Sequence, residues 1–245
     1  MLDIAIIGGT GLSSLKGLTI THREMVNTPY GQASSPLVFG VLEGCKVVFL
    51  ARHGSAHTIA PHQVNYRANL WALKQTGIKQ VIAVAAVGGI REDMSPGRIV
   101  FPDQIIDYTW SRHHTYFEDN EEVRHIDFTY PYCEKMRAVL IEGARKAGLN
   151  PVIDGTYAAT QGPRLETAAE IKRLANDGCA IVGMTGMPEA TLARELDLCY
   201  ATCAVVANWA AGINAEVITM EEIDVNVKQG MSKVRKLLEH SLPSA

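Results

Sequence analysis

Groups that can bind a small oxyanion follow two apolar runs near the start of the chain. Thr10 lies in a glycine-rich turn after residues 2–7, and Arg52 and His53 follow residues 45–51. Hydroxyl groups, loop N–H groups and a guanidinium all donate hydrogen bonds to such an anion, and the guanidinium adds a positive charge. The turn lacks GxGxxG and the GK[ST] of a P-loop, so a merely tight turn explains it equally well.

Three histidines in the same region have the residue type of metal ligands. His53, His57 and His62 lie in one loop, and no carboxylate accompanies them. We therefore favour an oxyanion site here and expect no metal.

The stretch 179–212 adds two polar groups at strand ends. Thr185 follows the apolar run 180–183, and Asn208 follows the run 200–207. Continuous apolar runs of this length are typical of parallel strands buried on both faces. Ligands of open α/β sheets bind at the carboxyl ends of the strands, so both side chains are candidates for a binding site. A helix cap at Thr185 and a strand-end turn at Asn208 explain the same residues without a ligand.

Predicted strands and helices alternate along the chain. Apolar runs predict strands at 2–7, 37–42, 45–51, 80–87, 98–108, 152–159, 180–183 and 200–207. Helical spacing and glycine stops predict helices at 64–76, 133–147, 167–174, 190–195 and 220–240. The polar, histidine-rich segment 110–127 is predicted to be a long loop. Without repeats or a linker, we expect one α/β domain over residues 1–245.

Composition excludes several classes of partner. The chain has 245 residues, 47% of them hydrophobic, and a net charge of −3, which gives no electrostatic footprint for nucleic acid or an anionic membrane. It shows no leader pattern and no membrane-length apolar run. Five cysteines without a CxxC pattern fit buried thiols in a reducing compartment. These features predict a cytoplasmic protein.

Several motifs occur in a specific order over nearly the whole chain. They are IIGGTGL (6–12), ARHG (51–54), VNYRANLWALK (64–74), GPR-ET-AE (162–170), GMTGMPEATLARE (183–195) and the strand that ends at Asn208. Together they resemble the trimeric purine nucleoside phosphorylase and methylthioadenosine phosphorylase family. The resemblance implies a mixed, partly barrel-like central sheet flanked by helices, and a homotrimer. It also implies an enzyme that splits purine nucleosides with inorganic phosphate as co-substrate and needs no cofactor.

The resemblance assigns a role to each matching position of the phosphate site. It implies that phosphate is held by Thr10, Arg52, His53 and Thr185, and that the backbone of Ala85 and Ala86 borders it. It also implies that Met184 flanks the ribose. Ala85 departs from the family, which usually has Thr at this position, and the consequence for phosphate binding is open.

The residues expected at the base depart from the methylthioadenosine branch. That branch has Asp in place of Asn208, a second Asp in place of Ala210, and Ser in place of Glu166, whereas a Glu/Asn pair resembles the enzymes for 6-oxopurines. An ionised Glu166 accepts from the N1–H of hypoxanthine but faces a lone pair at N1 of adenine. We therefore expect Glu166 and Asn208 to act at a 6-oxopurine, with Trp209 and Ala210 beside them.

The residues expected at the sugar are apolar. Met220 and Ile223 match positions that receive a 5′-methylthio group in the family, and His125 matches a residue lent by the neighbouring subunit. Without a ligand, Met220 and Ile223 are ordinary stripe residues of an amphipathic helix. By default, Glu166 beside Arg164 is a surface ion pair.

These assignments predict phosphorolysis of a 6-oxopurine 5′-methylthionucleoside in purine salvage. The alternatives are an inosine or guanosine phosphorylase, a methylthioadenosine phosphorylase with an unusual base site, and a nucleoside-binding protein without turnover. The complete phosphate set argues against the last of these, because a pure nucleoside binder needs no phosphate site.

Overall fold

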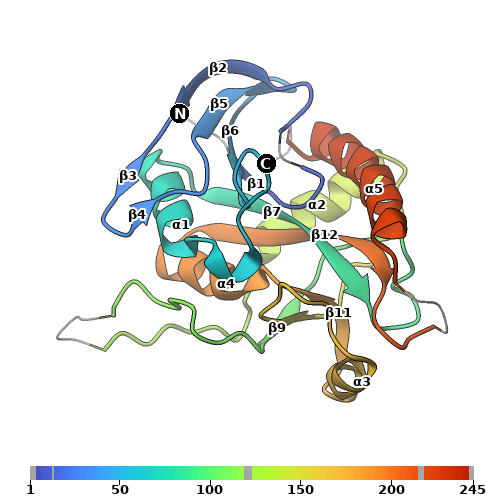
Figure 1. The fold of residues 1–245 in the computed structure, drawn as a ribbon. Helices are drawn as coiled ribbons and strands as arrows, with labels where there is room; N and C mark the ends of the chain where they lie inside the picture. The colour runs from blue at the N-terminus through green and yellow to red at the C-terminus, as the bar shows by residue number, and fades with distance from the viewer. Residues whose placement is uncertain (1–3, 13, 119–122, 215–217, 243–245) are drawn as a thin grey trace.

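A ten-stranded mixed sheet lies at the centre of the molecule, in a computed structural model that describes residues 4–12, 14–118, 123–214 and 218–242 (Figure 1). Its strands are β1 (Ile4–Gly8), β2 (Thr19–Glu24), β5 (Leu37–Leu42), β6 (Cys45–Ala51), β7 (Gln80–Gly89), β8 (Ile99–Val100), β9 (Gln104–Asp107), β10 (Thr156–Ala159), β11 (Cys179–Gly183) and β12 (Cys199–Trp209). The strand order is β2-β5-β6-β1-β7-β11-β10-β9, with β12 paired to β7 and β8. The short strands β3 (Asn27–Thr28) and β4 (Gly31–Gln32) form a separate hairpin.

Helices cover both faces of the sheet because side chains alternate along its strands. On one face, Ala5 and Ile7 pack in a core with α1 (Tyr66–Gln75) and α4 (Gly186–Glu195). On the other face, Ile4 and Ile6 pack in a core with α2 (Glu134–Lys146) and α5 (Met220–Ser241). A smaller core lies beneath α3 (Ala168–Asn176), and η1 (Pro61–Gln63) is a single 3-10 turn. The predicted fold class, a mixed sheet flanked by helices, is confirmed.

Strand β7 has more than two partners, and this opens a gap in the sheet. β12 pairs with one edge of β7 along its whole length. The other edge is shared, because β1 pairs in parallel with residues 81–83 and β11 pairs antiparallel with residues 88–89. Within the described part of the chain, no strand pairs with residues 84–87 on that edge. The backbone of β7 is therefore left without a strand partner where the sheet divides.

Most predicted elements agree with the structure, and the exceptions have identifiable causes. The predicted strand 98–108 is two short strands, β8 and β9, since Pro102 between them lacks an N–H for a ladder. The predicted strand 152–159 shortens to β10, which begins after Gly155, where φ is +128°. Strand β2 was not predicted, because all six of its residues are exposed and no apolar alternation marks it.

The predicted long loop is confirmed for its described residues. Residues 109–118 and 123–130 form no helix or strand and project from the body at the lower left of Figure 1. We call these two segments the arm. Trp110, Val123 and Tyr130 expose 65%, 77% and 73% of their surfaces there. Large apolar groups are thus exposed on this extension, although other arm residues bind the body, as Tyr116 does with Arg67 and Glu195.

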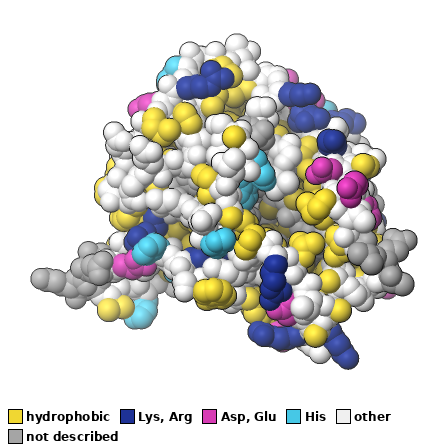
Figure 2. Space-filling model, in the orientation of Figure 1, with side chains coloured by type: hydrophobic (Ala, Val, Ile, Leu, Met, Phe, Trp, Pro, Cys, Tyr) yellow, Lys and Arg dark blue, Asp and Glu magenta, His cyan; other side chains and the backbone are white. Residues whose placement is uncertain are grey.

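Figure 2 shows how charged side chains are distributed over one face of the molecule. On the face drawn in Figure 2, lysine and arginine side chains are interspersed with acidic ones and gather into no extended basic patch. Among the helices that the structure describes, none has the length and apolarity to cross a membrane.

The expectation that all five cysteines are thiols is wrong. Cys133, the N-cap residue of α2, forms a disulfide with Cys199 at the start of β12, 66 residues later. The pairing follows from the packing of α2 against β12, which no local spacing reveals. Cys179 and Cys203 are buried thiols, and Cys45 donates to the carbonyl of Leu242. The cysteines consequently no longer support a reducing compartment.

The disulfide is expected to contribute to stability by restricting the unfolded chain. Cys133→Ser should lower the free energy of unfolding by about 2–4 kcal/mol. Denaturant titration of the wild type with and without a reductant measures the same quantity. Cys45→Ser, outside the disulfide, is the control. Equal midpoints for oxidised and reduced wild-type protein would contradict this expectation.

Candidate active site

One pocket of about 450 Å³ lies at the gap beside residues 84–87 of β7. The ends of β6, β11 and β12 and the start of α5 contribute to its walls. It brings together twelve of the residues predicted for a site, which are Thr10, Arg52, His53, Ala85, Ala86, Glu166, Met184, Thr185, Asn208, Ala210, Met220 and Ile223. Trp209 and His125 do not line it. His125 is exposed on the arm, and a neighbouring subunit was expected to supply it.

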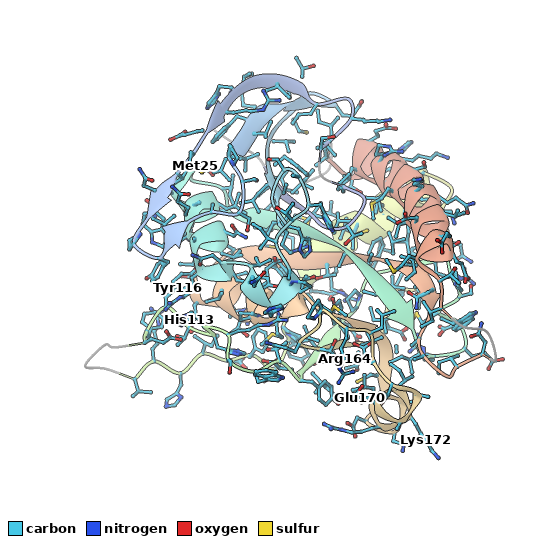
Figure 3. All side chains as sticks on the ribbon, in the orientation of Figure 1. Met25, His113, Tyr116, Arg164, Glu170 and Lys172 are labelled. Atoms are coloured by element: carbon cyan, nitrogen blue, oxygen red, sulfur yellow. A yellow bond between two sulfur atoms is a disulfide. The ribbon has the colours of Figure 1, made fainter. Side chains whose placement is uncertain are left out.

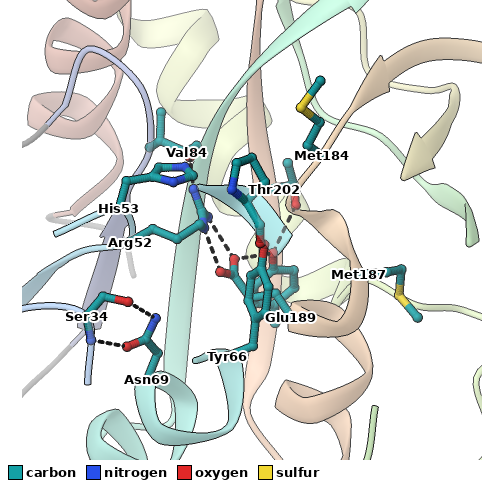
Figure 4. Close-up of polar contacts among 12 residues, drawn as sticks. Ser34, Arg52, His53, Tyr66, Asn69, Val84, Met184, Met187, Glu189 and Thr202 are labelled. Carbon is teal, nitrogen blue, oxygen red and sulfur yellow. Dashed lines mark hydrogen bonds and ion pairs between the residues drawn. The ribbon is translucent and has the colours of Figure 1, made fainter. Parts of the chain in front are cut away.

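A buried ion pair fixes Arg52 beneath this pocket. Arg52 Nε and Nη2 donate to the two carboxylate oxygens of Glu189 at 2.6 and 2.8 Å (Figure 4). Nη1 donates to the carbonyl of Val84 at 2.9 Å, which is where β7 loses its strand partner. Tyr200 of β12 donates to Glu189 as well, at 2.8 Å. Arg52 is 1% exposed and Glu189 is fully buried, so the guanidinium has one defined orientation.

The ion pair also sets the charge at this end of the pocket. Burial would lower the pKa of Arg52, but the charge and hydrogen bonds of Glu189 outweigh it and raise the pKa above the ordinary value. Arg52 therefore stays protonated, with its positive charge balanced by Glu189. A guanidinium has five N–H groups. Three are used by Glu189 and Val84, which leaves one on each Nη atom for a ligand.

The neighbouring His53 is a neutral imidazole. Its Nδ1 lies 2.8 Å from the carbonyl oxygen of Ile59, which only accepts, so Nδ1 carries the proton. Burial, followed by the positive charge of Arg52, lowers the pKa of His53 to about 4. At neutral pH the ring therefore presents an unprotonated Nε2 and adds no positive charge.

The turn after β1 packs directly on this arrangement. A Cβ at Gly9 would lie 2.5 Å from the carbonyl oxygen of Val84 and 2.9 Å from Nη1 of Arg52. Only glycine allows so close an approach, and it brings Thr10 to the pocket wall. The tight turn and the anion site are thus compatible interpretations of one segment.

Thr185 adds a second hydroxyl to the lining of this pocket. It is the N-cap residue of α4, but its side chain makes no capping hydrogen bond. The helix-cap explanation of this residue is therefore incorrect as far as its hydroxyl is concerned. Thr185 is 7% exposed and lines the pocket together with Ala85 and Ala86 of β7.

Glu166 is oriented by a threonine. Thr160 Oγ1 donates to Glu166 Oε1 at 2.7 Å, which leaves Oε2 available as an acceptor. The alternative ion pair with Arg164 does not form, since Arg164 binds both oxygens of Glu170 at 2.7 and 2.8 Å (Figure 3). Glu166 is thus a carboxylate at the pocket wall without a cationic partner in the described residues.

A bulge in β12 brings Asn208 to the same pocket. Val206 is opposite Val87 and Asn208 is opposite Gly88, so Ala207 is an extra residue. Such bulges redirect side chains next to active sites. Asn208 is 8% exposed, and its Nδ2 donates to the carbonyl of Trp209 at 2.7 Å. One N–H and the Oδ1 of its amide remain for a ligand.

The third wall is largely apolar. Met220 and Ile223, from the first turn of α5, line the pocket with Ile218, although Met220 is 64% exposed. His57 lines the pocket too, and its ring lies 4.8 Å from that of His53. As residues of an amphipathic helix, these side chains need no ligand, and Ile223 does pack against a core. Packing alone does not explain why Met220 and Ile223 both line the same pocket.

Sequence reasoning missed the partners that orient the site residues. Glu189 and Thr160 were not predicted to contribute, because each acts by orienting another residue, Arg52 or Glu166. One signal for Glu189 was available. It is a charged residue between Pro188 and Ala190 in an apolar helix, and a buried charge of this kind usually has a partner.

Comparison with known proteins places the chain in a family. A model of the phosphorylase superfamily matches residues 3–243. A probable S-methyl-5′-thioinosine phosphorylase of Pseudomonas syringae pv. tomato is 54% identical over the full length of both chains. A 6-oxopurine nucleoside phosphorylase of Pyrococcus furiosus is 44% identical, with 99% of this chain and 93% of that one covered.

Solved structures agree with this assignment. A methylthioadenosine phosphorylase from Schistosoma mansoni, in complex with adenine, superposes with a TM-score of 0.95 at 32% identity. The match covers 100% of this chain and 92% of that one. With the family model, the relatives and the fold in agreement, the chain belongs to the phosphorylase superfamily.

Proposed function

We propose that the protein catalyses phosphorolysis of S-methyl-5′-thioinosine to hypoxanthine and 5-methylthioribose 1-phosphate. The observation that carries this proposal is one pocket with three chemically different walls. Anion-binding groups, a carboxylate–amide pair and apolar side chains all line it. Several relatives at about half identity bear the name of this activity, which supports the same substrate.

In this proposal, phosphate occupies the wall formed by Thr10, Arg52, His53 and Thr185 and the backbone of 85–86. Two hydroxyls and the remaining Arg52 N–H groups donate to it, and the neutral His53 accepts a hydrogen bond from a protonated phosphate oxygen. A phosphate oxygen attacks C1′, and the electron pair of the C1′–N9 bond goes to the purine, which then takes up a proton. These phosphate-binding groups promote the reaction by positioning the phosphate and by preorganised electrostatics. Phosphate is a co-substrate, and we propose no metal or organic cofactor.

The base is recognised by Glu166 and Asn208. Because Thr160 occupies Glu166 Oε1, Oε2 is the acceptor for the N1–H of hypoxanthine. The N–H of Asn208 that Trp209 leaves free donates to N7 or O6 as negative charge builds on the leaving base. Adenine offers a lone pair at N1, which would leave Oε2 of this partly buried carboxylate without a donor.

The sugar is bound at Met184 and the apolar wall around Met220 and Ile223, which suits a methylthio group. A second candidate is phosphorolysis of inosine or guanosine. The observation that favours it is His57, whose imidazole lines the same pocket and can bind a 5′-hydroxyl. The relatives named 6-oxopurine nucleoside phosphorylases support the same alternative.

We further propose that the protein is a homotrimer. The arm exposes large apolar groups, as a subunit contact requires, and in the trimer it would bring His125 to a neighbour's pocket. A cytoplasmic location also remains a proposal.

The first test is phosphate-dependent base release from methylthioinosine, methylthioadenosine, inosine and adenosine in parallel. Preference for methylthioinosine is expected, because both the base and the apolar wall select it. Comparable or better use of inosine would retain the base assignment and reject the 5′-methylthio assignment. Preference for methylthioadenosine would reject the roles of Glu166 and Asn208, and no phosphate-dependent release would indicate a binding protein.

Glu166→Gln tests the base assignment without a change in size. Gln replaces the carboxylate acceptor by a group that can also donate, so we expect kcat/KM for methylthioinosine to fall by about 10²-fold or more. Glu170→Gln is the matched control, because Glu170 binds Arg164 nearby and does not line this pocket. Equal losses for the two variants would show that Glu166 has no special role.

Met220→His tests the apolar wall. A polar ring at this position is expected to raise the ratio of kcat/KM for inosine to that for methylthioinosine, by about tenfold. Met220 is largely exposed, so the substitution should leave thermal unfolding unchanged. An unchanged ratio would place the 5′ group elsewhere.

A further inference from the structure

Arg112, at the base of the arm, is nearly buried beneath the active-site loops. It is 9% exposed. Its Nη1 donates to the carbonyls of Met184 and Met187 at 2.9 and 2.6 Å. Its Nη2 donates to the carbonyls of Gln161 and Thr160 at 2.8 and 3.3 Å, and Nε donates to Oε1 of Gln161 at 3.1 Å. One guanidinium thus binds four backbone carbonyls from two separate segments.

The two segments carry opposite ends of the pocket. Met184 and Met187 bracket Thr185 at the phosphate end, and Figure 4 draws both on the same side of the Arg52–Glu189 pair. On the other side of Arg112, Thr160 donates to Glu166 at the base end. Met187 belongs to the first turn of α4, and the other three carbonyls lie just beyond the ends of β10 and β11, where Thr160 N donates to the carbonyl of Gly183 at 2.8 Å. Beyond these strand ends, Arg112 provides a direct bridge between them.

Arg112 also has no nearby counter-ion. Among the residues described, no carboxylate lies within 4.0 Å of its guanidinium, whereas Arg52 is balanced by Glu189. Burying an unpaired cation is costly. Here the carbonyl dipoles and the ring of Tyr66, whose centroid is 5.5 Å away, offset part of that cost. Since His53 is neutral, Arg112 supplies a positive charge behind Thr185 that, among the described residues, no carboxylate within 4.0 Å balances.

We propose that Arg112 is a positioning residue of the phosphorolysis reaction, with two separable effects. Its forked donors fix the base-binding loop relative to the phosphate-binding loop, and its unbalanced charge favours the phosphate anion. This inference rests on the proposed function for its first effect. The second effect requires only that phosphate binds.

Three variants separate these effects. Arg112→Lys keeps the positive charge but loses the paired hydrogen bonds of the guanidinium, because an ammonium cannot reach both pairs of carbonyls in the same geometry. Arg112→Gln loses both. Arg137→Gln is the matched control, since Arg137 is also nearly buried, at 7% exposed, and donates to the backbone carbonyls of Pro102 and Phe101. Arg137 does not line the pocket.

Two measurements on the full-length protein provide the readouts. Calorimetry with inorganic phosphate alone measures phosphate affinity, which tests the effect of the charge. The kcat/KM for methylthioinosine at saturating phosphate tests the positioning of the two loops. Arg112→Gln should weaken phosphate binding about tenfold. Arg112→Lys should bind phosphate within about twofold of wild type but lose about 10²-fold in kcat/KM, as misplaced reacting groups do. Arg137→Gln should match the wild type in both.

Each of the two proposed effects can be rejected by one result. Equal phosphate affinity for Arg112→Gln and the wild type rejects the charge effect, and an unchanged kcat/KM for Arg112→Lys rejects the positioning effect. Thermal unfolding identifies a variant that fails to fold. In that case Gln161→Ala, which removes one acceptor of the fork and leaves Arg112 in place, tests positioning. If the wild type does not cleave methylthioinosine, the proposed function fails, while phosphate calorimetry still decides the charge effect.

Discussion

The buried ion pair between Arg52 and Glu189 is the interaction on which the site depends. It joins the end of β6 to α4, and through Val84 and Tyr200 it also reaches β7 and β12. Loss of either partner would leave an uncompensated charge in the core, which typically costs 3–5 kcal/mol. The pair therefore constrains both the position of Arg52 and the packing of the elements around it.

The pair lies where the sheet divides, and that division provides the space for a ligand. β1 and β11 leave residues 84–87 of β7 without a strand partner, so backbone groups that a continuous sheet would use become available. The general rule places ligands of α/β sheets where neighbouring strands diverge. In this chain the same gap is bordered by the loops after β1, β6, β11 and β12, which explains why residues distant in sequence share one pocket.

The site residues at strand ends could be predicted from the sequence, whereas the side chains that bind and orient them could not. Thr10, Arg52, Thr185 and Asn208 were recognisable because each follows an apolar run of strand length. The resemblance to a family added Glu166, Met220 and Ile223, which no local pattern singles out. Contacts such as Arg52 with Glu189, 137 residues apart, depend on tertiary packing and leave no periodic signal. The Cys133–Cys199 disulfide was missed for the same reason.

The bulge in β12 makes the base end of the pocket depend on chain length as well as on residue type. A bulge adds one residue that the partner strand does not match, and this extra residue bends the strand and increases its twist. A substitution at Ala207 keeps the bulge, whereas deletion of Ala207 would leave Asn208 opposite Gly88 but remove the bend of the strand next to it. Enzymes that diverge on this sheet are accordingly expected to change base preference by exchanging side chains in β12, and to confine insertions and deletions to the loops.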